Sequence, residues 1–166
     1  MINPINRQMT KRSIIFSLFA CLLMLGSCTK NNLVEVNMGI PENNWLYAKS
    51  VKAAFEVKDS TQAYNFHFRL RNTAAYRYAN IYVVLHIKGK DFGKAVRYQF
   101  KLAKPDGQWL GKGAGDLYTS DFSLLTNYRF AKTGKYEVEI EQNMRDNPLV
   151  GISDAGLTIE KSEQLQ

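Results

Sequence analysis

Apolar and polar residues alternate along much of the chain after residue 50, which is the pattern of β-strands with one buried and one exposed face. In the first such segment, Val51, Phe55 and Val57 alternate with Lys52 and Glu56. The other segments with a full or shorter alternation are 64–70, 81–87, 96–102, 127–131, 136–140 and 157–159. No stretch sustains a helical period, so the pattern predicts an all-β chain.

Turn-forming residues lie between the predicted strands. The strongest turn signal is Pro105-Asp106-Gly107, because proline presets one backbone dihedral and glycine permits a positive φ. About seven or eight short strands separated by turns are typical of an antiparallel sandwich. We therefore expect an antiparallel β-sandwich of the jelly-roll type.

The N-terminal segment has a different pattern. Arg7, Lys11 and Arg12 precede an apolar run that ends at Leu25. This run is shorter than the about 20 residues of a transmembrane helix, and it fits a cleaved signal peptide. Leu25-Gly26-Ser27-Cys28 follows the pattern of a lipobox, where the signal peptide of a bacterial lipoprotein is cleaved and the cysteine is acylated.

These patterns divide the chain into three parts. We expect a lipoprotein signal peptide at 1–27, a lipid-anchored tether at 28–44 and a β-sandwich domain at 45–166. The expected lipidation site is Cys28, and the expected first partner is the lipid bilayer that receives its acyl chains. An ordinary signal peptide with an incidental Cys28 is the alternative. Attachment by two or three acyl chains would be close to permanent, whereas one chain binds only marginally.

The cysteine content excludes several classes of cysteine-dependent site. Cys21 leaves with the predicted signal peptide and Cys28 is used for acylation, so the folded part has no free thiol. This excludes a disulfide framework, a cysteine zinc site and a thiol nucleophile.

The basic charge is modest and dispersed. The predicted signal peptide contains three basic residues and no acidic one, so its removal lowers the net charge from +7 to +4. The remaining lysines and arginines occur singly and not in runs. This distribution argues against nucleic acid as a partner, and also against a polybasic patch for lipid headgroups.

The chain offers few groups for catalysis or metal binding. His67 and His86 are the only histidines, both lie on the polar side of their predicted strands, and the sequence names no third metal ligand. We therefore expect no metal and no cofactor. A Gly-x-Ser-x-Gly motif is absent from the sequence, although counting residues leaves a serine–histidine–aspartate hydrolase open.

The glycine-rich segment 107–116 is the densest motif. It lacks the spacing, the serine or threonine and the following helix of a P-loop, so we expect no nucleotide. Trp109 and Lys112 within it either complete a tight crossing at a sheet edge or present a surface to a partner.

Two polar residues, Asn72 and Gln142, continue the inward phase of their strands. A polar side chain in a core must be hydrogen-bonded. Arg71 and Arg145 lie close to them and either support that network or reach a partner. The candidate interaction residues are therefore Arg71, Trp109, Lys112 and Arg145.

Two segments of the chain are distinctive as a pair: Gly107-x-Trp109-Leu110-Gly111-Lys112-Gly113-x-Gly115-Asp116, and Gln142-x-Met144-Arg145. Further segments accompany them in order: Ile40-Pro41 with Trp45, Leu70-Arg71-Asn72, Phe130-x-x-x-Gly134-x-Tyr136, and Gly151-Ile152. On these residues the chain resembles the GldH gliding-motility lipoproteins of Bacteroidetes.

The resemblance implies a cell-envelope lipoprotein that supports gliding motility and the associated type IX secretion machinery through contacts with other envelope proteins. It implies no enzymatic activity and supplies no catalytic residue. Thr29-Lys30-Asn31-Asn32 lacks the acidic cluster associated with surface export, which favours the outer membrane with the domain facing the periplasm.

Two other function classes stay open. A carbohydrate- or cell-wall-binding module would expose Trp109 or Tyr118 in a groove. A hydrolase would bring two carboxylates, or a serine and a histidine, into one cleft.

Overall fold

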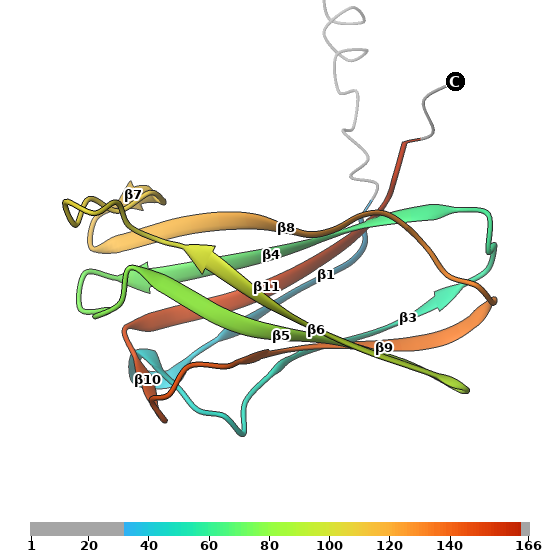
Figure 1. The fold of residues 1–166 in the computed structure, drawn as a ribbon, viewed down its shortest axis with the longest axis horizontal. Helices are drawn as coiled ribbons and strands as arrows, with labels where there is room; N and C mark the ends of the chain where they lie inside the picture. The colour runs from blue at the N-terminus through green and yellow to red at the C-terminus, as the bar shows by residue number, and fades with distance from the viewer. Residues whose placement is uncertain (1–31, 164–166) are drawn as a thin grey trace, which may run out of the picture. The chain divides into compact units, whose positions relative to one another are not determined.

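The computed structural model describes residues 32–163, and nearly all of their regular structure is β-sheet. Two antiparallel sheets pack face to face as the layers of a sandwich (Figure 1). One sheet has five strands in the order β1-β11-β4-β8-β7, and the other has four in the order β3-β9-β5-β6.

The five-stranded sheet is formed by β1 (Asn32–Gly39), β11 (Ile152–Lys161), β4 (Ala63–Thr73), β8 (Leu117–Arg129) and β7 (Lys112–Ala114). The four-stranded sheet is formed by β3 (Val51–Val57), β9 (Gly134–Gln142), β5 (Asn80–Gly89) and β6 (Phe92–Lys101). The short strands β2 (Asn44–Trp45) and β10 (Leu149–Val150) form a separate antiparallel pair. The 3₁₀-helix η1 (Pro41–Asn43) directly precedes β2.

The longer strands follow the order of a jelly roll. Setting aside the three shortest strands, β2, β7 and β10, leaves eight of the eleven in the described chain. Counted along the chain, these eight form the sheets 1-8-3-6 and 2-7-4-5. This is the double Greek-key arrangement of a jelly roll. The expected fold class is confirmed, and the expected seven or eight strands correspond to these longer strands.

The alternating pattern builds one core between the sheets. The inward side chains Phe66, Phe68 and Leu70 of β4 are completely buried, as are Ile81 and Ile87 of β5. Burial of each such side chain contributes about 1.5–3 kcal/mol. The hydrophobic effect therefore holds the two sheets together without a disulfide among the described residues.

The prediction of a tether is wrong for residues 32–39, because they form β1 at the edge of the five-stranded sheet. Their backbone pairs with β11, and Val34, Val36 and Met38 pack against the core. The sequence does alternate there, since Val34, Val36 and Met38 are separated by Glu35 and Asn37, but the run is short and ends at Gly39, so it resembles a linker.

The short strand expected at 127–131 is the end of a much longer strand, β8. Bulges opposite Tyr64, Phe66 and His67 shift the register between β4 and β8, and Asn127 has a φ of 54°. Each bulge reverses which residues face the core. The period of two is therefore broken along β8 and hides its length.

The predicted signal peptide at 1–27 and the predicted lipidation site Cys28 lie outside the described residues. Within residues 32–163, no helix has both the length and the apolar character to cross a bilayer.

Both polar residues expected in the core are buried and hydrogen-bonded, as predicted. Gln142 Nε2 donates to the backbone oxygens of Asp146 (3.1 Å) and Trp45 (3.4 Å), and its Oε1 accepts from the Met144 N–H (2.9 Å). Asn72 Nδ2 donates to a backbone oxygen at 3.1 Å. Gln142 thus ties the segment after β9 to β2.

Replacing Ser50 by alanine is expected to destabilise the protein in a pH-dependent way. The Ser50 hydroxyl donates to Glu139 Oε1 at 2.6 Å, and this hydrogen bond, together with nearby Lys52, lowers the pKa of Glu139. A lowered pKa in the folded state stabilises the protein above the unfolded pKa of about 4.5, and this contribution is lost as the pH falls through the folded pKa. We expect a loss of about 1 kcal/mol near neutral pH.

Urea unfolding near neutral pH and at a pH below the lowered folded-state pKa of Glu139 measures this effect. The difference between Ser50→Ala and the natural protein should shrink at the lower pH, where Glu139 is protonated in both. Ser60→Ala is the matched control, because the Ser60 hydroxyl has no hydrogen bond to any described residue. An equal loss at both pH values would contradict the role assigned to Ser50.

Candidate functional site

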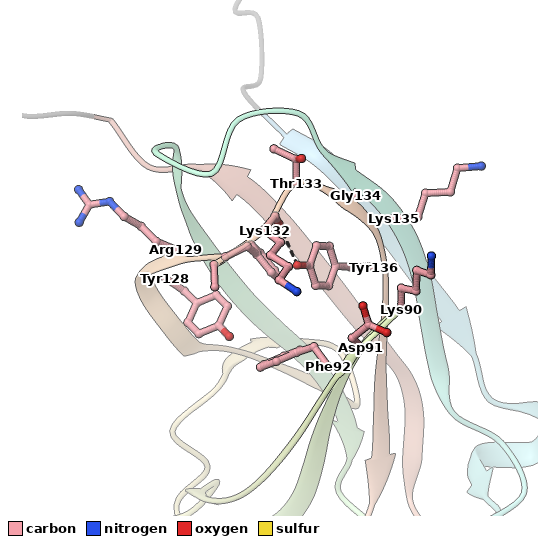
Figure 2. Close-up of a pocket in the computed structure, with 12 residues that line it drawn as sticks. Lys90, Asp91, Phe92, Tyr128, Arg129, Lys132, Thr133, Gly134, Lys135 and Tyr136 are labelled. Atoms are coloured by element: carbon pink, nitrogen blue, oxygen red, sulfur yellow. Dashed lines mark hydrogen bonds between the residues drawn. The ribbon is translucent and has the colours of Figure 1, made fainter.

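A pocket opens at one end of the sandwich, where β5 turns into β6 and β8 turns into β9 (Figure 2). Residues 90–92 and 128–136 line it, and its volume is about 520 Å³. This volume lies in the range of small-molecule sites, about 300–1,000 Å³. The pocket is therefore the candidate functional site.

Four aromatic rings, Phe92, Tyr128, Phe130 and Tyr136, give the pocket an apolar wall. The centroids of Phe130 and Tyr136 lie 4.3 Å apart, those of Tyr128 and Phe130 4.9 Å, and those of Phe92 and Tyr136 6.4 Å. Phe130 and Tyr136 also belong to the core, whereas Phe92 is one of the exposed large apolar side chains. The wall is thus an open extension of the core.

Local sequence explains how the rings reach the surface. A Cβ atom at Gly89 would lie 2.7 Å from Cε1 of Tyr136, so glycine leaves room for that ring beside the β5–β6 turn. The Tyr136 hydroxyl donates to the Lys132 carbonyl at 2.9 Å and fixes the ring against the β8–β9 turn.

Basic side chains surround the rings. The lining includes Lys90, Arg129, Lys132 and Lys135 against the single carboxylate Asp91, a net charge of +3. In Figure 2, Lys132 ends close to Tyr136 and Lys90 lies beside Asp91, whereas Arg129 and Lys135 reach outward on opposite sides. No salt bridge within residues 32–163 neutralises these four side chains.

Two further features, a nearby lysine and a neutral tyrosine hydroxyl, keep the pocket positively charged. Lys94 Nζ lies 4.8 Å from the ring centre of Tyr128, a cation–π contact. Burial raises the pKa of the Tyr128 hydroxyl, so this group stays neutral at physiological pH. The site combines apolar surface with unpaired positive charge, which suits a ligand that carries an anionic group.

Of the predicted interaction residues, the structure brings Arg71 and Lys112 into one row. Arg71 of β4 lies opposite Thr119 of β8, and Thr119 lies opposite Lys112 of β7. Arg71 Nε donates to Oδ2 of the buried Asp154 at 2.5 Å, while Lys112 is exposed. This row crosses the outer face of the five-stranded sheet, at the end opposite the pocket.

The other two predicted residues lie near that same end without joining the row. Trp109 is half-buried, and its ring packs against Tyr118 (centroids 5.5 Å apart) and Tyr76 (6.4 Å). Arg145 is exposed in the segment after β9. Trp109 is neither an open platform nor a fully buried plug, so its burial does not choose between the two interpretations of the glycine-rich segment.

The two histidines lie on opposite outer faces of the sandwich. His67 Nε2 lies 3.3 Å from Glu160 Oε1 on the five-stranded sheet, and His86 Nε2 lies 3.0 Å from Glu141 Oε1 on the four-stranded sheet. Ser123 is opposite His67, but its hydroxyl is hydrogen-bonded to Thr126 at 3.0 Å. In the described part of the chain, no group of three acidic, histidine or cysteine side chains is placed to hold a metal.

Sequence reasoning missed the pocket. Its basic residues come from two turns about 40 positions apart, so they form no run in the sequence. Its aromatic residues were read as ordinary core residues, and for Phe130 and Tyr136 this is also true. Only the exposed Phe92 beside Lys90-Asp91 was a local signal.

Solved structures with a similar arrangement of strands have low sequence identity. A non-crystalline cellulose specific carbohydrate-binding module, CBM28, has a TM-score of 0.43 and 9% identity over 82% of this chain and 78% of that chain. The TNF protein Eiger from S. frugiperda has a TM-score of 0.32 and 11% identity over 83% of this chain and 92% of that chain.

Sequence relatives are more informative. The gliding motility lipoprotein GldH homolog of Christiangramia forsetii is 33% identical over 90% of this chain and 96% of its own length. The gliding motility lipoprotein GldH of Flavobacterium johnsoniae is 30% identical over 92% of this chain and 98% of its own length. Residues 32–159, which include the sandwich from β1 to nearly the end of β11, match the GldH lipoprotein family. The chain therefore belongs to the GldH family of gliding motility lipoproteins.

Proposed function

We propose that this lipoprotein is a non-catalytic component of the cell envelope, which supports gliding motility and the associated type IX secretion machinery through contacts with other envelope proteins. The observation that carries the proposal is the family match over residues 32–159. The domain would be held by acyl chains on Cys28 at the outer membrane and would face the periplasm.

The chemistry of the pocket supports a binding role. Asp91 is its single carboxylate, and the lining contains no histidine, cysteine or serine. General acid–base catalysis needs a proton donor and acceptor within hydrogen-bond reach of the substrate. A lining of rings and unpaired cations suits recognition of a ligand better than proton transfer.

The protein contacts would involve the end of the sandwich opposite the pocket. Lys112 and Arg145 are exposed there, and Trp109, three residues before Lys112, offers a half-buried ring. Arg71 would act with them while it holds Asp154. We propose this set as the surface for envelope proteins, and Cys28 as the lipidation site.

Chemical crosslinking and affinity capture of the tagged full-length protein from native envelopes test the proposal. We expect recovery of gliding or type IX secretion proteins with the natural protein and strongly reduced recovery with Cys28→Ala. Lys112→Glu should also reduce recovery, whereas Lys101→Glu, an exposed lysine outside the proposed surface, should not. Unchanged recovery with Cys28→Ala would refute the role of the anchor.

Carbohydrate or cell-wall binding is the second candidate, and the aromatic wall of the pocket favours it, since sugar rings stack on aromatic faces. Recovery of glycan alone in the capture experiment would support this candidate against protein contacts.

A further inference from the structure

We propose that the pocket end of the sandwich faces the membrane, and that the pocket binds the phosphate headgroup of an anionic phospholipid in the bilayer that holds the anchor. This inference rests on the proposed acylation of Cys28. Three observations carry it: where β1 begins, the unpaired charges of the pocket, and the exposed ring of Phe92.

The described chain begins at the pocket end. Asn32 of β1 pairs with Glu160 of β11, and Glu160 pairs with Asn65 of β4. Asn65 is next to Tyr64, which lies opposite Tyr128 of the pocket. Neighbouring strands are about 4.8 Å apart, so three strand spacings, roughly 15 Å, separate Asn32 from Tyr128.

The chain before β1 is short. Cys28 precedes Asn32 by four residues, and a fully extended chain spans at most about 3.6 Å per residue. Asn32 is therefore at most about 14 Å from an acylated Cys28. A domain held this closely presents to the membrane the end at which β1 begins, and this is the end that contains the pocket.

The charge of that end complements an anionic membrane. Lys90, Arg129, Lys132 and Lys135 have no salt bridge among the described residues, and only Asp91 opposes them in the lining. The other charged groups of this end largely balance one another. Glu56 is the cross-strand neighbour of Lys135, without a salt bridge to it, and Lys58 is next to Asp59. Lys161 lies between Glu160 and Glu163, and Glu160 contacts His67. The excess positive charge is thus concentrated in the pocket.

The apolar part of the pocket suits the membrane interface. Phe92 is 42% exposed and lines the pocket next to Asp91, below Tyr136 in the view of Figure 2. Aromatic side chains favour the headgroup level of a bilayer, and basic side chains beside them bind lipid phosphates. The pocket offers both within one opening.

Hydrogen exchange of the acylated mature protein on vesicles tests this inference. The protein is reconstituted into phosphatidylcholine vesicles with and without phosphatidylglycerol. We expect backbone amides in 90–92 and 129–135 to exchange about fivefold more slowly on the anionic vesicles, since each basic side chain near an anionic surface favours binding by about this factor. Added salt should weaken the protection.

A charge-matched pair of variants makes the test specific. The double variant Lys90→Gln, Lys132→Gln should lose the protection from exchange on anionic vesicles. The control double variant Lys101→Gln, Lys104→Gln should keep this protection. These control lysines are exposed at the opposite end, since β6 runs from Phe92 at the pocket to Lys101. All four side chains are exposed, so the substitutions leave the core intact.

Several results would overturn the inference. One is equal exchange on neutral and anionic vesicles, and another is equal loss in both double variants. Protection by free glycerol phosphate in detergent, without vesicles, would make the pocket a site for a soluble anion. Failure of the natural protein to sediment with either kind of vesicle would instead refute the anchor at Cys28, and the inference with it.

Discussion

Gly151→Ala is expected to lower the free energy of unfolding by about 3 kcal/mol or more, the largest effect that we expect of a glycine-to-alanine substitution within residues 32–163. Gly151 has a φ of +91°, and a Cβ atom there would lie 2.6 Å from the backbone nitrogen of Tyr76 and 2.7 Å from its Cα. The disfavoured φ costs about 1–2 kcal/mol, and forced displacement of packed backbone adds about 1–3 kcal/mol.

The position is also a junction of the backbone. The Gly151 N–H donates to the Asn43 carbonyl, and its own carbonyl accepts from the Thr73 N–H, both at 2.8 Å. Displacement of Gly151 therefore disturbs η1, the end of β4 and the start of β11 together. The clash involves backbone on both sides, so no side-chain rotation relieves it.

Two matched glycines separate the causes. Gly107 has a φ of +86° with nothing within 4 Å of an added Cβ atom, so Gly107→Ala should cost about 1 kcal/mol from backbone strain alone. Gly93 has open space and no positive φ, so Gly93→Ala should be close to neutral. Urea unfolding followed by circular dichroism measures all three. A Gly151→Ala variant no less stable than Gly107→Ala would contradict the predicted clash.

Arg71→Ala is expected to lower the free energy of unfolding by about 2 kcal/mol. The side chain of Asp154 is only 4% exposed, and its Oδ2 accepts the hydrogen bond from Arg71 Nε. Its Oδ1 has no hydrogen-bond partner and is the one such atom among the buried side-chain polar atoms of residues 32–163. Removal of Arg71 leaves a buried carboxylate without a hydrogen-bond partner, although the charge of Arg69 still acts on it. Because Arg71 itself is 41% exposed, water softens the cost below the about 3–5 kcal/mol of a fully buried pair.

Arg69→Ala is the matched control, two residues away on the same face of β4. Arg69 Nε donates to Asp121 at 2.7 Å, but more than half of each of these side chains is exposed. An exposed pair contributes at most about 1 kcal/mol, so we expect a much smaller loss. The double variant Arg71→Ala, Asp154→Asn should recover part of the stability, because it removes the buried charge. Equal losses for Arg69→Ala and Arg71→Ala would show that burial of Asp154 has no energetic consequence.

The hydrogen bond to Asp154 also changes the interpretation of Arg71. Its position in the sequence favoured either a structural network or a partner surface, and the structure supplies the network in the form of Asp154. No local signal revealed the pair, since the two residues are 83 positions apart and meet through the pairing of β4 with β11. A loss of partner binding in Arg71→Ala must therefore be compared with its loss of stability.

The sequence by itself determined the fold class, because a period of two with turns between strands has few solutions other than an antiparallel sandwich. It also determined the family, because the segments around Trp109 and Met144 are local and distinctive. Gln142 was predictable as a buried, hydrogen-bonded residue because its phase along β9 follows from Val138 and Ile140.

Tertiary structure alone decided β1, the extent of β8 and the pocket. The alternation in β1 covers only a few residues, and the bulges opposite β8 break the alternation along that strand. Lys90 and Lys132 are far apart in the sequence, so the sequence predicted no basic patch. The β5–β6 turn and the β8–β9 turn bring these two residues to one end of the sandwich. The number of positions between two residues in the sequence does not give the distance between them in the fold.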